Sequence, residues 1–138
     1  MDPHRLQRFV DAQRDVYDRV EIELRAGRKQ SHWMWYIFPQ LEGLGHSPMA
    51  QKFAISSLEE ASAYLRHPLL GPRLLSCTGL VNAVKGRSLE DIFGFPDNLK
   101  FHSSMTLFAH ATADNGVFLH ALKNYCRSEF DGATMARL

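Results

Sequence analysis

The sequence predicts an all-α fold, a single compact domain over residues 1–138 with about seven helices, several of them short. Apolar residues recur at helical spacing, helix-capping residues are frequent, and no segment alternates convincingly between apolar and polar residues. The short helices argue against a simple four-helix bundle. Composition agrees with a folded domain, since 45% of the residues are hydrophobic and 22% are charged.

The first predicted element is one long amphipathic helix over residues 2–24. Asp2 can cap its start, and Pro3 suits the first helical position. Apolar residues follow at spacings of three and four, and Gly27 is a natural end for the helix. The aromatic run over residues 33–38 comes next and is the one candidate strand, which a two-stranded ribbon could use.

Capping residues predict where the middle helices begin. Ser47 begins a short helix that ends near residue 55, and Ser57 begins another with the spacing of a capping box. A strongly apolar segment, residues 69–84, predicts a longer helix that is closed by Gly86.

The last third of the chain predicts four more helical segments. Ser88 and Asp91 cap a helix of one or two turns, and Asp97 can cap a longer helix that runs to about residue 112. Residues 117–125 form the last main helix, and Asp131 caps a short terminal turn.

Charge and composition exclude several classes of protein. Lys and Arg number 16 and Asp and Glu 15, so the formal net charge is +1 and bulk attraction to nucleic acid or an anionic membrane is ruled out. No apolar run is long enough to span a bilayer, and no charged start leads into a signal core. We therefore expect a soluble, cytoplasmic protein.

Cysteine and histidine spacing predicts neither a disulfide framework nor a metal site. Cys77 and Cys126 lie far apart in the sequence, and we expect both to be reduced and partly buried. None of the seven histidines forms a recognised metal-binding motif. No cofactor is predicted.

The segment from Arg28 to Gln40 is the first candidate site. Cations at Arg28 and Lys29 precede two tryptophans, Trp33 and Trp35. Such a pairing suits a nucleotide, because an indole stacks on the base while a cation pairs with phosphate, and the amide of Gln40 can read a polar edge. The alternative is that the aromatic run is core and the cations form a solvated turn.

A second candidate site begins at Asp97. Asp97, Lys100 and Ser104 lie three and four residues apart, so they share one face of the predicted helix. These groups could bind a polar ligand or orient a water molecule, with Asp97 as the catalytic group. The alternative is an N-cap at Asp97 with Lys100 on the surface. The sequence contains no nucleophile elbow and no phosphate-binding glycine loop of known type.

Three strings carry a resemblance to a known family: Trp33-Met34-Trp35, Gly43-Leu44-Gly45 and Ser103-Ser104-Met105-Thr106-Leu107-Phe108. With them, the chain resembles the bacterial family of domain of unknown function 1810, often mislabelled calpastatin. The resemblance covers nearly the whole chain. It implies a small, mostly helical fold and no particular activity.

A fainter resemblance links the segments 68–79 and 91–94 to the NADAR family, which acts on ADP-ribose-type N-glycosidic compounds. At the place of that family's catalytic glutamate this chain has His46 and Ser47. The resemblance therefore implies a shared fold or a nucleotide-type ligand, without a shared mechanism.

These observations lead to two main hypotheses. In the first, the candidate residues meet in one pocket that binds a nucleotide-derived, ADP-ribose-like small molecule, or binds and hydrolyses it. In the second, the Trp/Phe-rich segment is an exposed patch for a protein partner or a homodimer, without enzymatic activity. A nucleic-acid partner is the least favoured, and the sequence leaves the oligomeric state open.

Overall fold

Ten helices and no strand make up the fold, which confirms the all-α prediction. The computed structural model describes all 138 residues, of which 58% are helical, and six helices have seven or more residues. In chain order the helices are α1 (Gln7–Gln13), α2 (Tyr17–Arg25), α3 (Met34–Ile37), α4 (Pro48–Lys52), α5 (Leu58–Arg66), α6 (Leu70–Ala83), α7 (Leu89–Phe93), α8 (Asp97–Ala109), α9 (Gly116–Tyr125) and α10 (Gly132–Met135).

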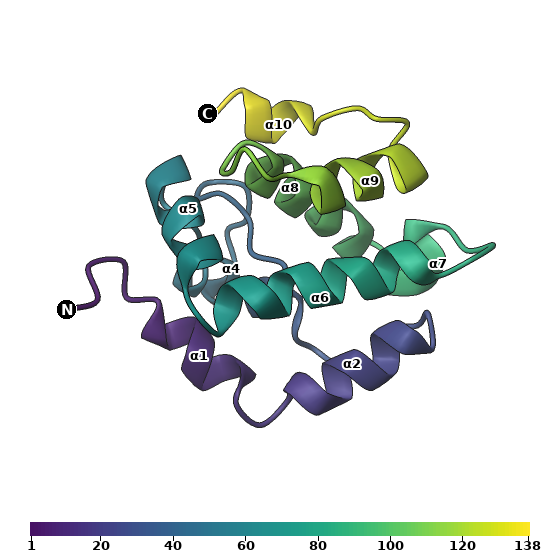
Figure 1. Cartoon of the computed structure of the whole chain (residues 1–138), viewed down its shortest axis with the longest axis horizontal. Helices are drawn as coiled ribbons and strands as arrows, with labels where there is room; N and C mark the ends of the chain where they lie inside the picture. Colours follow the sequence, from purple (N-terminus) through teal and green to yellow (C-terminus); the bar gives the residue numbers. More distant parts are fainter.

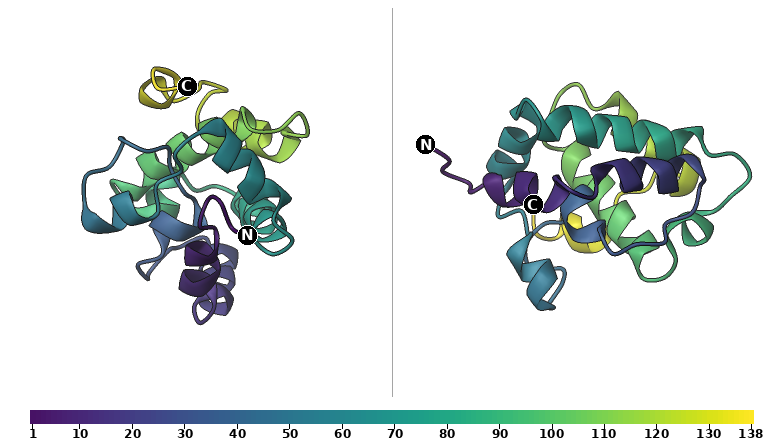
Figure 2. Two further views of the ribbon diagram at one scale, coloured as in Figure 1. Left: turned by 90° about the vertical axis from the view of Figure 1, so that its left-hand side faces the viewer. Right: turned by 90° about the horizontal axis from the view of Figure 1, so that it is seen from below.

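Helix α6 crosses the middle of the molecule, with α2 packed on one side of it and α9 on the other (Figure 1). Helix α8 packs against α5, α7, α9 and α10, so it joins the two halves of the chain. In the left view of Figure 2, α10 and α1 lie at opposite edges of the molecule. All 28 buried hydrophobic residues belong to one core cluster, as expected of a single domain.

The predicted N-terminal helix is wrong as one element, because the chain breaks between α1 and α2. Gln13, the last residue of α1, is buried, and its amide donates to the Tyr36 carbonyl (2.8 Å) and the Tyr64 hydroxyl (3.2 Å). The break lets α1 pack on α3 while α2 packs on α6. Asp2 does accept backbone N–H groups near the start of α1, but the helix begins only at Gln7.

The aromatic run over residues 33–38 is not a strand. Its centre is the single turn α3, and most of its side chains are buried in the core. The Phe38 ring, for example, meets Phe93 and Phe101 edge to face at 5.7 and 5.0 Å. Aromatic side chains packed on all sides favour a compact turn here over an edge ribbon with one exposed face.

The predicted caps are confirmed at four helices. Ser47, Ser57, Ser88 and Asp131 each accept a hydrogen bond from a backbone N–H in the first turn of the following helix. Asp97 is the exception, because Pro96 precedes α8 and no side chain caps it. The carboxylate of Asp97 is therefore free for the contacts described below.

None of the ten helices combines the length and the apolar character needed to cross a membrane. The cysteines form no disulfide; Cys77 is buried in α6, and Cys126 is partly buried after α9.

Candidate functional site

Glu23 on α2 positions the chain that leads to the Trp-Met-Trp motif. Its buried carboxylate accepts hydrogen bonds from Trp33 Nε1 (2.9 Å), Ser31 Oγ (2.6 Å) and the backbone N–H groups of Gln30 (2.7 Å) and Ser31 (3.0 Å). Burial by itself would raise the pKa of Glu23, but these four donors lower it to about 2. The carboxylate is therefore ionised at neutral pH and fixes the path of residues 30–33.

Lys29 lies at the start of this path and is tied to the other half of the molecule. Its backbone N–H donates to the Ile92 carbonyl in α7 (2.7 Å). Its ammonium lies 2.9 Å from Oδ2 of Asp97, the first residue of α8. Lys29 is thus held by backbone and side chain together.

Asp97 is shared between two lysines. While Oδ2 faces Lys29, Oδ1 lies 3.1 Å from the ammonium of Lys100, one turn further along α8. The side chains of Lys29, Asp97 and Lys100 are 8%, 18% and 24% exposed, so the cluster is partly shielded and opens to solvent on the Lys100 side. Two ammonium groups and one carboxylate leave it with a net charge of +1.

Each lysine of this cluster lies over an indole of the Trp-Met-Trp motif. The Lys29 ammonium is 5.2 Å from the Trp33 ring centroid, and the Lys100 ammonium is 5.1 Å from that of Trp35. Both distances are within the range of a cation–π interaction. Trp33 is 1% exposed and belongs to the core, whereas Trp35 is only partly buried. Trp35 is therefore the indole that a ligand can reach.

Gln40 lies beside Trp35, in a hollow that also includes Gly43 and Gly45. The hollow has a volume of only about 10 Å³, which is room for one water molecule. The Gln40 side chain has no hydrogen-bond partner in the protein. A ring larger than a water molecule has to lie on the exposed side of Trp35, because it cannot enter this hollow.

Two predicted residues do not join the cluster. Ser104 is on α8, one turn beyond Lys100, but it is fully buried and its hydroxyl has no hydrogen-bond partner. Arg28 is exposed and makes no ion pair. The structure thus brings together Lys29, Trp33, Trp35, Asp97 and Lys100, with Gln40 beside them, and leaves Arg28 and Ser104 apart.

The second hypothesis requires the Trp/Phe-rich segment to be exposed. Trp33, Met34, Tyr36, Ile37 and Phe38 are all buried, so the Trp/Phe-rich segment forms no exposed patch. The alternative of an interaction module on this segment therefore has no exposed aromatic patch to use, because these side chains fill the core.

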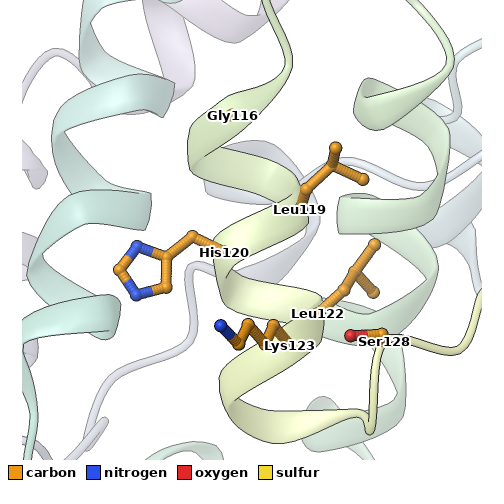
Figure 3. Close-up of a pocket in the computed structure, with 6 residues that line it drawn as sticks. All are labelled: Gly116, Leu119, His120, Leu122, Lys123 and Ser128. Atoms are coloured by element: carbon orange, nitrogen blue, oxygen red, sulfur yellow. The ribbon is translucent and has the colours of Figure 1, made fainter.

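A larger hollow lies along α9. It has a volume of about 510 Å³ and is lined by Gly116, Leu119, His120, Leu122, Lys123 and Ser128 (Figure 3). None of the predicted site residues lines it. No group of three or more His, Cys, Asp or Glu side chains could hold a metal ion.

Glu23, the residue that positions the Trp-Met-Trp motif, is not among the site residues predicted from the sequence. A signal for it exists, because Glu23 lies three residues after Val20 and next to Leu24, within the apolar stripe of its helix. A carboxylate at such a position needs hydrogen-bond donors in the core. The donors come from residues 30–33, which only the folded chain brings back to α2.

The fold and the site define an all-α protein with a lysine–aspartate–lysine cluster next to two indole rings. The chain belongs to the family described as "Protein of unknown function (DUF1810)", which it matches over residues 3–138. The resemblance to the family of domain of unknown function 1810 is thereby confirmed.

One solved structure supports the same assignment. The crystal structure of the conserved hypothetical protein Rv1873 from Mycobacterium tuberculosis is similar to this chain with a TM-score of 0.98 and 61% sequence identity. The match covers 99% of this chain and 98% of that one. A comparison with curated proteins found no match.

Proposed function

We propose that the protein binds a nucleotide-derived small molecule, of the ADP-ribose type, at the Lys29–Asp97–Lys100 cluster and the exposed side of Trp35. The observation that carries this proposal is the position of Lys100, whose ammonium lies over the Trp35 ring and beside the Asp97 carboxylate at once. The indole on which a ring can stack and the ammonium that can pair with a phosphate thus lie next to each other.

The charge of the cluster supports an anionic ligand. One carboxylate cannot neutralise two ammonium groups, and Lys29 is too shielded to be compensated fully by water. A phosphate near Lys100 would supply the missing negative charge. Because Lys100 is the more exposed of the two lysines, it is the one that contacts the ligand first.

The surroundings of Trp35 support a ring-shaped ligand. The indole is fixed by its place in α3 and by Lys100 over it, so stacking on it costs little conformational entropy. Gln40, with an amide free of protein partners, lies beside this indole and offers both a donor and an acceptor to the edge of a base.

The geometry favours binding over hydrolysis. Each oxygen of Asp97 already faces an ammonium, so neither oxygen is free to contact a water molecule or a ligand. For Asp97 to act as a general base or to stabilise an oxocarbenium-like centre, the ligand would have to displace Lys100. In our proposal Asp97 is the counterion that holds both lysines in place.

A thermal-shift screen tests the proposal. The panel contains NAD, ADP-ribose, common nucleotides and nucleosides, measured on the wild type and on Lys100→Met and Trp35→Leu. A ligand at a hundred times its Kd stabilises the fold by about 2.7 kcal/mol, which raises the Tm of a domain of this size by several degrees. We expect this shift for at least one phosphate-bearing compound, and its loss in both variants.

The matched control is Lys52→Gln. Lys52 is exposed and lies over the Phe53 ring, so its removal also costs a cation and a cation–π contact, but Lys52 takes no part in the Lys29–Asp97–Lys100 cluster. The control should retain the full shift. A panel without any shift, or a shift that survives in both Lys100→Met and Trp35→Leu, overturns the proposal.

Asp97→Asn separates binding from hydrolysis. If Asp97 is a counterion, its neutralisation leaves the two ammonium groups uncompensated, and a phosphate ligand binds as tightly as before or more tightly. If Asp97 is catalytic, the wild type releases a base or ribose product from the bound compound and the variant does not. Product analysis by chromatography distinguishes the two outcomes.

A further inference from the structure

Charge is distributed unevenly along this chain. Residues 67–87, which include α6, and residues 115–128, which include α9, contain none of the 15 Asp and Glu residues and five of the 16 Lys and Arg residues. Helices α6 and α9 pack against each other. The fold therefore places two segments without carboxylates side by side, and the net charge of +1 conceals a basic region.

Two hollows lie in this region and share His120. The first is the hollow of about 510 Å³ along α9, whose two hydrophobic lining residues are the exposed Leu119 and the buried Leu122. The second, about 360 Å³, is lined by the chain that follows α6, including Lys85 and Arg87. Figure 3 shows Leu119 and Leu122 on one side of α9 and His120 extending to the other. His120 thus lies where an apolar hollow meets a cationic one.

Three cations around these hollows have no carboxylate partner. Lys85, Lys123 and His120 are exposed and form no ion pair or hydrogen bond with another side chain. Arg87 donates to the backbone carbonyls of Gly27 (3.0 Å) and Asp91 (3.2 Å), and its guanidinium is close enough to the Asp91 carboxylate to interact with it electrostatically. Lys85 and Lys123 are therefore the positive charges that are free to bind an anion from solution.

Asn82 adds an independent observation. Its amide nitrogen donates to the Val117 carbonyl (3.2 Å), which orients the side chain between α6 and α9. Asn82 lines the second hollow, and its Oδ1 atom is buried without a hydrogen-bond partner. A buried acceptor without a donor is costly, so a small movement of the Asn82 side chain toward the hollow would let a hydroxyl or N–H group of a ligand satisfy it.

We propose that these adjoining hollows bind a small organic anion, with its apolar group against the exposed Leu119 and its phosphate or carboxylate at Lys85 and Lys123. His120 contacts the ligand where its two parts join. Each hollow has the volume of a small-molecule site, which a short ligand fills and a nucleic-acid duplex does not. None of these residues belongs to the Lys29–Asp97–Lys100 cluster, so this is a second site.

The test uses naphthalene compounds that differ in their charged group, with inorganic phosphate as the control without a ring. 1-Naphthyl phosphate and 1-naphthoate carry the two candidate anionic groups, 1-naphthol is the neutral counterpart, and inorganic phosphate has no ring. Binding to the full chain is measured by calorimetry, and the site is located by two-dimensional amide NMR. We expect at least one naphthyl anion to bind, the neutral ring and inorganic phosphate to bind at least tenfold more weakly, and the amide shifts to cluster in residues 82–87 and 116–128. The stronger of the two anions identifies the preferred group.

Two double variants decide whether the site is specific. Lys85→Gln with Lys123→Gln should weaken binding of the naphthyl anion at least tenfold. Arg19→Gln with Arg66→Gln removes the same charge from exposed residues elsewhere and should leave the affinity unchanged. Because a naphthyl phosphate also has the ring and the phosphate expected at Trp35, both double variants are measured in the Lys100→Met background, in which the first site is impaired. No binding at millimolar concentration in that background, equal weakening by both double variants, or amide shifts confined to the residues around Trp35 would each overturn the second site. Binding that persists in the Lys100→Met background belongs to the second site, so the two proposals fail independently.

Discussion

The indole of Trp33 donates to the carboxylate of Glu23 over 2.9 Å in the interior of the protein. This hydrogen bond joins α2 to the start of α3, and it does so at a carboxylate that three further donors keep ionised. The segment between Glu23 and Trp33 contains Lys29 and brings its ammonium to the carboxylate of Asp97. Replacement of the carboxylate should therefore affect both the stability of the fold and the geometry of the candidate site.

Glu23→Gln should destabilise the protein by about 3 kcal/mol at pH 7. The pKa of Glu23 is lowered from 4.5 to about 2 in the folded state, and each pKa unit corresponds to about 1.4 kcal/mol. Because the folded-state pKa is the lower one, this stabilisation is complete above pH 4.5 and is lost as the pH falls through 2. Urea unfolding of the wild type and the variant at pH 7 and pH 3 measures both effects.

The difference between the two proteins is the quantity that matters, because other carboxylates titrate in the same range. Asp2, Asp11 and Asp91 also have lowered pKa values, mainly through hydrogen bonds, but they are present in both proteins. More than half of the difference at pH 7 should disappear at pH 3. A difference that is the same at both pH values would contradict the role of the Glu23 charge.

The two ion pairs of Asp97 should differ in strength. A double-mutant cycle with Lys29→Met and Asp97→Asn should give a coupling free energy of about 2 kcal/mol, because Lys29 is shielded from water. The same cycle with Lys100→Met should give less than about 1 kcal/mol, because Lys100 is the more exposed partner. Urea unfolding in low and in high salt measures both couplings, and salt should weaken the Lys100 coupling more. Equal couplings would contradict the difference in shielding.

Local signals predicted the helices well where the helix ends are set by local chemistry. The serines at positions 47, 57 and 88 cap their helices as predicted, since an N-cap depends only on residues three or four apart. The break between α1 and α2 was not predictable in this way. It coincides with Gln13, the last residue of α1, whose partners Tyr36 and Tyr64 come from distant parts of the chain.

The candidate site was predicted in its residues but not in its geometry. The spacing of Asp97 and Lys100 places them on one face of a helix, and this relationship is local. The contact of Lys29 with Asp97 depends on the packing of the 27–33 segment against α7 and α8, for which the sequence contains no periodic signal. The difference in burial between Trp33 and Trp35 also results from tertiary packing. The sequence therefore does not show which of the two indoles remains accessible, although both belong to one motif.

Two glycines of α6 should respond in opposite ways to replacement by alanine. A Cβ atom on Gly71 would overlap the backbone carbonyl of Leu65 in α5, whereas a Cβ atom on Gly79 would meet nothing within 4 Å. Gly71→Ala should therefore destabilise the protein by about 2 kcal/mol or more, since one of the two helices has to move. Gly79→Ala should stabilise it by about 0.5–1 kcal/mol, because alanine is the better helix former. Thermal unfolding of the two variants measures the signs, and a stabilised Gly71→Ala would contradict the close approach of α5 and α6.

Both cysteines should be poorly reactive in the folded protein. Burial is the main cause that raises the pKa of Cys77 and of Cys126, in each case to about 11. At pH 8 few of the thiols are therefore ionised, and the thiolate is the reactive form. Cys77 is also inaccessible, since it is fully buried in α6, whereas Cys126 is partly exposed.

A colorimetric thiol reagent at pH 8 should therefore modify Cys126 slowly and Cys77 only through unfolding. Cys126→Ser leaves Cys77 as the single thiol, and its modification rate should rise with urea in parallel with the unfolded fraction. Cys77→Ala, with a smaller side chain at a fully buried position, should have a lower free energy of unfolding. In this variant the remaining thiol, Cys126, should react at a rate that is nearly independent of low urea concentrations. Rapid modification of Cys77 in the absence of urea would contradict the packing of α6 in the core.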